Sequence, residues 1–319
     1  MTRITARRLS VGTTACFGLL VLAAAPALAV ECGEVITGQA RLDRDLICEA
    51  DPALIVNGGR LDLGGFTVVC DHEEGAPSVG VLLEGQGARL RGGAVAGCVL
   101  AIWVADLGGH IVRNVTASAS NQGVFIDSDG NRLLDSAVLR GFNDAAVQIN
   151  GDNNIARFND IAGSSDQGFE VNGSDNRIVG NRIGGVGEGI QLAGDGNQVL
   201  RNHIIGTAER GVEVREGAHV IAFNLIADGG TDGIALIVGN GNHVHQNAVY
   251  GNGDEGIEVS TLDNTIERNR VLLNGVDLQD TTANCDNNLW ENNEFETSDT
   301  PNSPENCIEG SVVPALVEG

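Results

Sequence analysis

Two acidic residues and one basic residue stand at spacings that could serve carbohydrate chemistry. Glu170 and Glu213 are 43 residues apart, and Arg215 follows Glu213 by two residues. If the two glutamates lie on parallel strands two turns of a solenoid apart, their separation is about 9.6 Å. Carboxyl groups near that distance can hydrolyse a glycosidic bond with inversion, and Arg215 would hold a substrate carboxylate. Alternatively, these residues only fill an exposed sheet face, which needs polar side chains in any case.

A second candidate site combines Asp160, Arg182 and His203. Each follows a recurrent asparagine by one residue in successive repeats. Neighbouring strands would therefore place them about 4.8 Å apart, within reach of one another. His203 would act as a general base and Arg182 would hold an anion. The alternative is an ordinary ladder of charges on the surface.

Acidic residues also precede the glycines of the repeat, at Asp144, Asp166, Glu188, Glu209, Asp232 and Glu255. Asp127 and Asp129 belong to a D-S-D-G turn. Carboxylate oxygens at turns are ligands that calcium prefers, which makes Ca²⁺ at Asp127 and Asp129 the candidate cofactor. The preference of aspartate for turns explains most of this pattern without a metal. His243 and His245, with Glu267 one repeat later, form a weaker metal candidate, and no metal site is assigned.

The elements that must position these residues repeat about every 22 residues. A small residue opens each G-[IVF]-x-[ILV] segment, at Gly80, Ala101, Gly123, Ala146, Gly168, Gly189, Gly211, Gly233, Gly256 and Gly275. Alternation of apolar and polar residues in these segments predicts short strands with their apolar side chains inside. We expect each glycine, or each Asp-Gly or Asn-Gly pair, to supply a turn with unusual backbone angles. A period of this length without helical spacing indicates a solenoid of β-coils.

Asparagines recur in step with the strands. One column comprises Asn114, Asn159, Asn181, Asn202, Asn224, Asn247, Asn269 and Asn293, with Ser136 in the gap. Five residues earlier, a second column comprises Asn131, Asn154, Asn176, Asn197, His219, Asn242, Asn264 and Asn288. Side chains that recur once per coil stack on one another, so their amides are expected to hydrogen-bond along the column and to satisfy buried turn groups.

The run SDNRIVGNRIGGVGEGIQLAGDGNQVLRNHI resembles the right-handed parallel β-helix repeats of the pectin-lyase-like superfamily, and the resemblance covers about residues 53–295. The segments 32–68 and 276–295 also resemble the two ends of exported bacterial β-helix proteins. The resemblance implies an all-β fold, a right-handed parallel β-helix solenoid of about 10–11 coils with disulfide-tied ends. It does not imply one activity, because the superfamily contains lyases, hydrolases, epimerases and proteins without catalysis.

The N-terminus reads as a signal peptide. Arg3, Arg7 and Arg8 precede an apolar run at 11–25, and an A-L-A cleavage motif ends at Ala29. We therefore expect a secreted or periplasmic protein with no membrane span after cleavage. The expected organisation is a signal peptide at 1–29, an N-terminal cap at 30–52, the β-helix at 53–295 and a C-terminal tail at 296–319.

Cleavage would leave six of the seven cysteines. An even number in an exported chain favours disulfides, and six cysteines allow fifteen pairings. Their grouping along the chain favours Cys32–Cys48, Cys70–Cys98 and Cys285–Cys307. We expect the first and last bridges to tie the ends of the solenoid, and Trp290 to close its last coil.

Charge and composition narrow the function. The chain has 43 acidic residues against 19 basic ones, all arginine, for a formal charge of −24. This balance argues against nucleic acid and anionic membranes as partners, because both need basic patches. Two functions stay open: a monomeric β-helix that binds extracellular polysaccharide or a surface partner, or serves as a rigid scaffold, and a polysaccharide lyase, hydrolase or uronate epimerase. Short connecting segments and missing enzyme motifs, such as D-P-H-D, favour the first.

Overall fold

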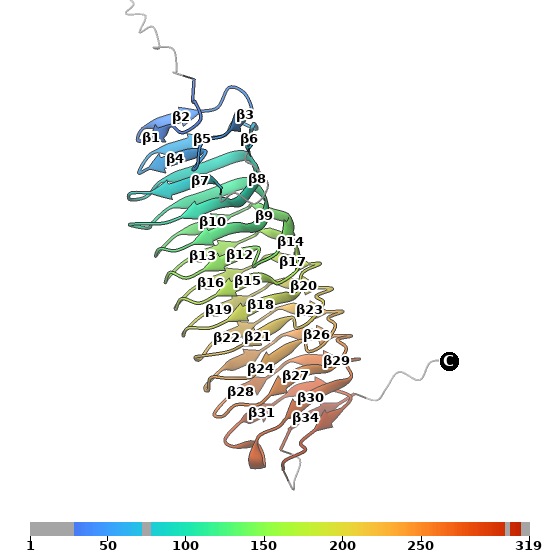
Figure 1. Ribbon diagram of the computed structural model, residues 1–319. Coiled ribbons are helices and arrows are strands. Elements are labelled where there is room, and N and C mark those ends of the chain that lie inside the picture. Colours follow the sequence, from blue (N-terminus) through green and yellow to red (C-terminus); the bar gives the residue numbers. More distant parts are fainter. Residues whose placement is uncertain (1–28, 72–77, 304–306, 314–319) are drawn as a thin grey trace, which may run out of the picture.

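Short alternating segments form strands, and each strand pairs in parallel with the strand one repeat further along the chain. In the computed structural model, residues 29–71, 78–303 and 307–313 are described, and they form a parallel β-solenoid of about twelve turns (Figure 1). The predicted signal peptide lies almost wholly outside the described residues. The count slightly exceeds the predicted 10–11 coils, because residues 35–48, expected within a cap, already form strands of the first coil.

Three parallel sheets run along the rod. The first sheet contains β1 (Val35–Ile36), β4 (Leu54–Asn57), β7 (Val79–Glu84), β12 (Val147–Ile149), β15 (Gln167–Val171), β18 (Glu188–Leu192), β21 (Val212–Val214), β24 (Ile234–Leu236), β27 (Glu255–Val259), β30 (Val276–Asp280) and β33 (Ser298–Asp299). The second sheet contains β2 (Gln39–Arg41), β5 (Arg60–Asp62), β10 (Arg132–Leu134), β13 (Ile155–Arg157), β16 (Arg177–Val179), β19 (Gln198–Leu200), β22 (Val220–Ala222), β25 (His243–His245), β28 (Thr265–Glu267) and β31 (Leu289–Glu291).

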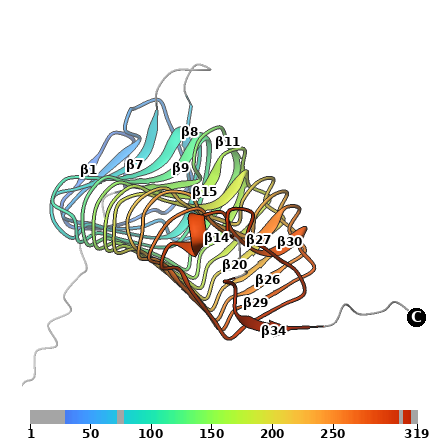
Figure 2. The ribbon, with the colours of Figure 1, turned by 90° about the horizontal axis from the view of Figure 1, so that it is seen from below.

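The third sheet contains β3 (Leu46–Cys48), β6 (Thr67–Cys70), β11 (Ala137–Phe142), β14 (Asp160–Ser164), β17 (Arg182–Gly184), β20 (His203–Ile205), β23 (Leu225–Ala227), β26 (Ala248–Tyr250), β29 (Arg270–Leu272), β32 (Asn293–Phe295) and β34 (Gly310–Val312). Two long strands, β8 (Arg89–Val104) and β9 (Ile111–Ile126), contribute to all three sheets. Viewed along the rod, the coils enclose one shared interior (Figure 2), which is filled by buried Val, Ile and Leu.

The glycine that precedes each strand of the first sheet is needed for space. A Cβ added at Gly189 would lie 2.2 Å from the carbonyl oxygen of Gly211 in the next coil and 2.7 Å from Cγ2 of Ile204 on the third sheet. Gly168 stands in the same way against Ile183. The backbone φ of neither glycine is positive. The prediction of unusual turn angles is therefore wrong for this column, where the backbone of the next coil and the third sheet exclude a side chain. It is confirmed at the Asp-Gly and Asn-Gly turns of Gly130, Gly196 and Gly241, whose φ is positive.

Both asparagine columns are continuous ladders inside the turns. Asn202 is buried: its Oδ1 accepts the Asn181 N–H at 2.9 Å, and its own N–H donates to Oδ1 of Asn224 at 2.8 Å. In the other ladder, His219 replaces asparagine as predicted, and His110 does the same without having been predicted. Asn114 was placed one position too early, because Val115 occupies the ladder position opposite Ser136 and Asn114 is exposed.

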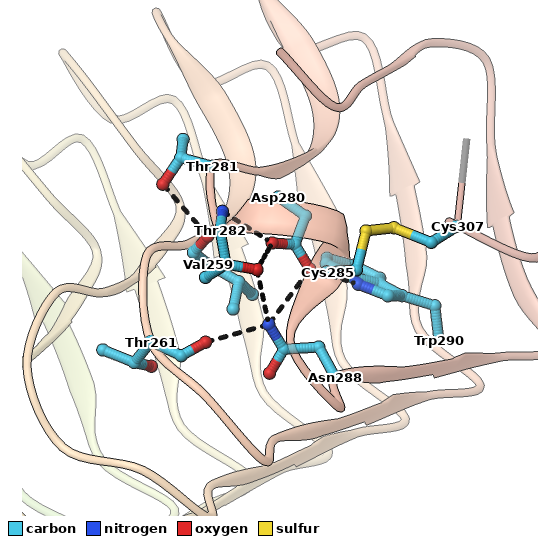
Figure 3. Close-up of a disulfide and its surroundings, with 9 residues drawn as sticks. All are labelled: Val259, Thr261, Asp280, Thr281, Thr282, Cys285, Asn288, Trp290 and Cys307. Atoms are coloured by element: carbon cyan, nitrogen blue, oxygen red, sulfur yellow. Dashed lines mark hydrogen bonds between the residues drawn. A yellow bond between two sulfur atoms is a disulfide. The ribbon is translucent and has the colours of Figure 1, made fainter. Parts of the chain in front are cut away.

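Disulfides join the predicted cysteines at both ends, Cys32 to Cys48 and Cys285 to Cys307, with Cys70–Cys98 inside the rod. The last bridge flanks a short 3₁₀ turn, η1 (Ala283–Cys285). Beside it, Trp290 is buried and donates its indole N–H to Oδ2 of Asp280 at 3.0 Å (Figure 3). Trp290 therefore closes the last coil of the second sheet, as predicted.

Candidate functional site

The first candidate site lies on the outer side of the first sheet. Glu170, Gln191 and Glu213 are aligned on the consecutive strands β15, β18 and β21. Glu170 and Glu213 therefore lie two coils apart on one face, with Gln191 between them. Glu170 is half-buried, and its Oε1 accepts a hydrogen bond from Nδ2 of Asn172 at 3.1 Å. The two glutamates therefore lie in one column along the rod, but they are not in direct contact.

Glu213 and Arg215 are in direct contact. Arg215 donates through Nε to Oε1 of Glu213 at 2.9 Å, and Nη1 of Arg210 lies 3.6 Å from the same oxygen. The Glu213 side chain is only 3% exposed, whereas that of Arg215 is 50% exposed. Burial opposes ionisation of Glu213, but hydrogen bonds from Arg215 and Glu188 hold its pKa below the ordinary value. The carboxylate is therefore a buried support beneath an exposed cation.

Glu188, one coil before Glu213, completes this group. It is buried, and its Oε2 accepts a hydrogen bond from Nε2 of Gln191 at 3.0 Å. Burial, together with the hydrogen bond to Glu213, raises the pKa of Glu188 to about 7. Oε2 of Glu213 is buried, and no N–H or hydroxyl group of the described residues donates to it. We infer that protonated Glu188 donates this bond, so that the two carboxyl groups share one proton.

The same column continues toward the C-terminus. Arg210 lies between Glu188 and Asp232 along the stack, and its Nε donates to Asp232 at 2.9 Å. Burial, followed by a hydrogen bond to Asp232, raises the pKa of Glu255 to about 7. The cluster therefore alternates acids with two arginines. We name Glu188, Arg210, Glu213, Arg215 and Asp232 the carboxyl–arginine cluster.

Sequence reasoning missed Glu188, Arg210 and Asp232 as partners of Glu213. Glu188 and Asp232 had been noted, but as turn-forming acids. The glycine column contained the missing signal: counting one residue back from Gly189, Gly211 and Gly233 gives Glu188, Arg210 and Asp232 in register.

The second candidate set is also brought together, on the outer side of the third sheet. Asp160, Arg182 and His203 are aligned on β14, β17 and β20. Nε of Arg182 lies 3.7 Å from Asp160, and both side chains are largely exposed. They line a shallow hollow of about 340 Å³. An exposed pair of this kind contributes little stability.

Most of the candidate metal ligands are engaged with protein groups, whereas Asp127 is exposed at its turn. Oδ1 of Asp129 accepts the Asp152 N–H at 2.8 Å, and calcium at Asp127 and Asp129 stays a prediction. His243 reaches Oε1 of Glu267 at 3.1 Å, and the rings of His243 and His245 stack at 4.3 Å. Within the described ranges, the one cluster with metal-ligand geometry is Asp280 with Cys285 and Cys307, whose sulfurs form the disulfide.

Comparison with solved structures shows the fold. A tailspike protein, Dettilon gp208, matches with a TM-score of 0.59 at 13% identity over 88% of this chain and 62% of its own. The A-module of the Azotobacter vinelandii mannuronan C-5 epimerase AlgE4 matches with a TM-score of 0.55 at 13% identity, over 90% and 91% of the two chains. This chain thus spans less than two thirds of the tailspike. No curated protein sequence matches it.

Two family models match the sequence. One, described as right handed beta helix region, matches residues 168–309. The other, described as periplasmic copper-binding protein (NosD), matches residues 45–210, which is more than half of the chain. Together they span the solenoid and agree with its parallel coils. The chain therefore belongs to the right-handed parallel β-helix proteins of the NosD family.

Proposed function

We propose that this protein works outside the cytoplasm as a β-helix that binds acidic polysaccharide on its first sheet, without processing it. The observation that carries the proposal is the difference in exposure within the carboxyl–arginine cluster. The Arg215 side chain is 50% exposed, while those of Glu213 and Glu188 are 3% and 6% exposed. The cation is presented to solvent, and the acids that would have to act on a substrate are covered.

Arg215 is suited to hold a uronate carboxylate. A guanidinium has five N–H donors, and Arg215 uses its Nε–H on Glu213, so the terminal nitrogens stay available for a bidentate contact. The ion pair with Glu213 fixes the direction of the side chain, which lowers the entropy lost when a ligand binds. The supporting carboxylate thus prepares the arginine for an anion.

The spacing of the buried acids does not suit glycoside hydrolysis. Retaining enzymes keep their two carboxyl groups about 5–5.5 Å apart, and inverting enzymes about 6.5–9.5 Å. Glu188 and Glu213 are buried neighbours, and the hydrogen bond inferred between them would bring their oxygens closer than either of these spacings. Glu170 and Glu213 have a more suitable spacing, but Glu213 is already neutralised by Arg215.

One observation favours the alternative, an enzyme that acts on uronates. A carboxyl group with a pKa near 7 is matched to general acid–base catalysis at neutral pH, and Glu188 has that property. The fold shared with a mannuronan epimerase is compatible with such an activity. For this role, Arg210 and Arg215 would have to swing away so that Glu188 could reach the substrate.

Location and metals also bear on the proposal. Three disulfides and a family described as periplasmic support a place in the periplasm or outside the cell. No helix in the described part of the chain could cross a membrane.

Copper, named in the family description, is not part of the proposal. Copper takes thiolate, thioether and imidazole ligands. The six cysteines of the solenoid are disulfide-bonded, and His110 and His219 bond backbone groups through both ring nitrogens. His243 and His245 lie side by side and half-buried, but within the described residues no third ligand joins them in metal-ligand geometry.

The test is binding of the mature protein to polymannuronate and polygalacturonate, with and without Ca²⁺, and to neutral dextran. The Arg215→Ala variant should bind polyuronates about tenfold more weakly than the parent, because it loses a charge-assisted bidentate contact. Arg270→Ala is the matched control, because Arg270 is 55% exposed and also paired with a glutamate; its binding should stay within about twofold. Absence of uronate binding by the parent protein, or equal losses in both variants, would refute the proposal.

Turnover is measured on the same polymers by reducing ends, unsaturated products and the epimer ratio. We expect none. If turnover is found and Glu188→Gln abolishes it while binding persists, the enzyme alternative replaces the binding role.

A further inference from the structure

The outer side of the second sheet concentrates positive charge that the composition of the chain conceals. Along the N-terminal half of this sheet the outward positions carry Arg41, Arg60, Arg89, Arg91, Arg113, Arg132, Arg157 and Arg177. The formal charge of the whole chain is −24. A basic strip on so acidic a protein is therefore a local feature, produced by the coiling.

These arginines border a groove. A hollow of about 450 Å³ runs over β2, β5, β8, β9 and β10, and five arginines line it, Arg60, Arg89, Arg91, Arg113 and Arg132. Its apolar lining includes Ile111 and Leu134, both half-buried and outward-facing. A surface with an apolar floor and cationic walls suits a ligand that has apolar patches and regularly spaced anions.

The positive charge of the groove is only partly compensated. Asp62 pairs with Arg91 at 2.8 Å and with Arg41 at 3.5 Å, and Asp135 pairs with Arg113 at 3.0 Å. For Arg60, Arg89 and Arg132, no carboxylate of the described residues lies within ion-pair distance, and all three are exposed.

Arg60 and Arg89 even stand opposite each other on neighbouring strands. Like charges at such positions repel, and a bound anion removes that cost. An anionic ligand would therefore relieve the most repulsion along the line formed by Arg60, Arg89 and Arg132.

We propose that this groove binds a segment of an extended acidic polysaccharide, with uronate carboxylates on Arg60, Arg89 and Arg132 and sugar rings over Ile111 and Leu134. Arginine, unlike lysine, matches a carboxylate with two parallel hydrogen bonds. The aligned positions follow the rod axis at about 4.8 Å per coil, so a linear chain lying along the rod meets successive arginines.

Nucleic acid fits the groove less well. Proteins that bind single strands stack bases on aromatic side chains, and none of the lining residues is aromatic. Duplex DNA also brings a dense phosphate charge, which the acidic remainder of this chain repels. The charge complementarity and the lining together favour the polysaccharide.

This groove shares no residue with the carboxyl–arginine cluster and lies on a different sheet. The inference goes beyond the proposed function, and the experiment separates the two. All groove variants are made in the Arg215→Ala background, so that loss of the first site cannot be mistaken for loss of the second. The probes are polymannuronate, neutral dextran and single-stranded DNA of equal charge, each measured by titration calorimetry at low and at high salt.

Arg89→Gln with Arg132→Gln should weaken polymannuronate binding more than about tenfold, since two charge-assisted contacts are lost. The control pair Arg268→Gln with Arg270→Gln removes the same charge from the C-terminal end, where both arginines are paired with glutamates. Binding of the control should change less than about twofold.

Both pairs replace exposed arginines, and melting temperatures verify that the variants are folded. Equal losses in the two pairs would overturn the proposal, because the effect would then be one of overall charge. Tighter binding of DNA than of polymannuronate would overturn it in favour of nucleic acid. A background protein that binds no polymannuronate at low salt would also overturn it.

Discussion

Glu188 and Glu213 are buried carboxyl groups on adjacent coils of the first sheet, and Glu213 has the closer arginine partners. Nη1 of Arg210 lies 3.6 Å from Oε1 of Glu213 and 4.0 Å from Oε1 of Glu188. The asymmetry decides which carboxyl group keeps the proton. Arg215 and Arg210 stabilise negative charge on Glu213, so that burial acts chiefly on Glu188 and raises its pKa to about 7. A proton held at neutral pH in a buried pair links the stability of the protein to pH.

The first prediction concerns this link. Between pH about 4.5, where an unfolded glutamate titrates, and pH about 7, folded Glu188 retains a proton that the unfolded chain releases. The free energy of unfolding should therefore fall as pH rises through this window. Glu188→Gln keeps an N–H donor for Glu213 and has no proton to lose. At pH 8 the variant should be more stable than the parent by about 1–3 kcal/mol, and at pH 4 the two should be alike.

Denaturant unfolding at several pH values measures this difference. The raised pKa of Glu255 makes the free energy of unfolding of both the parent and Glu188→Gln fall with pH. In the variant, the plot of this free energy against pH should therefore have a smaller slope than in the parent, but not a slope of zero. Glu170→Gln on the same face is the control, since Glu170 is not part of the shared-proton pair. Parallel curves for parent and Glu188→Gln would show that no proton is shared.

Much of the fold could be predicted from the sequence, because a solenoid repeats one local pattern many times. The 22-residue period placed the strands of the first sheet, and the recurrence of asparagine located both ladders. Single errors of register arose where the pattern was interrupted. Asn114 was assigned to a ladder that begins one residue later, because the long strand β9 has no asparagine at that position.

The candidate site was less predictable. Alternation along a strand placed Glu170, Glu213 and Arg215 on one outward face, which the structure shows. It gave no indication that Glu213 is buried on that face, since the burial of an outward residue depends on the coils above and below. The arginine groove was missed for a similar reason: net charge sums over the chain, whereas the coiling sorts residues 60, 89 and 132 onto one line.

The second prediction tests the packing role of the small column. Gly189→Ala should destabilise the protein by roughly 1–3 kcal/mol, because the new methyl group must displace Ile204 or the neighbouring backbone. Gly38→Ala is the matched control: Gly38 has no positive φ and nothing within 4 Å of an added Cβ. Melting temperatures compare the two. A stable Gly189→Ala variant would mean that the sheets yield easily at this position.

The third prediction concerns the asparagine ladder. Asn202→Leu removes an acceptor from the Asn181 N–H and donors to the Ile178 carbonyl and to Asn224, all of them buried. The cost should be about 1–3 kcal/mol, since these groups cannot turn to water instead. Asn172→Leu serves as the control, because the Asn172 side chain is exposed and its amide donates to two other side chains, those of Asn150 and Glu170. Equal effects of the two substitutions would contradict a special role of the buried ladder.

The last prediction concerns the C-terminal end, where the coils stop and strand edges are open to other chains. The Cys285–Cys307 bridge links η1 to the segment just before β34, and Trp290 packs beside it (Figure 3). Replacing both cysteines by serine releases a closed loop of 22 residues, for a loss of about 3 kcal/mol in the chain-entropy model. The variant should melt at a lower temperature and aggregate faster at moderate heat, because the last coil opens first.

The control variant, Cys70→Ser with Cys98→Ser, removes the bridge inside the rod. It should have a lower melting temperature without a comparable rise in aggregation below that temperature. Light scattering and calorimetry on the two variants separate these effects. Equal aggregation of both below the melt would mean that the C-terminal bridge does not protect the edge.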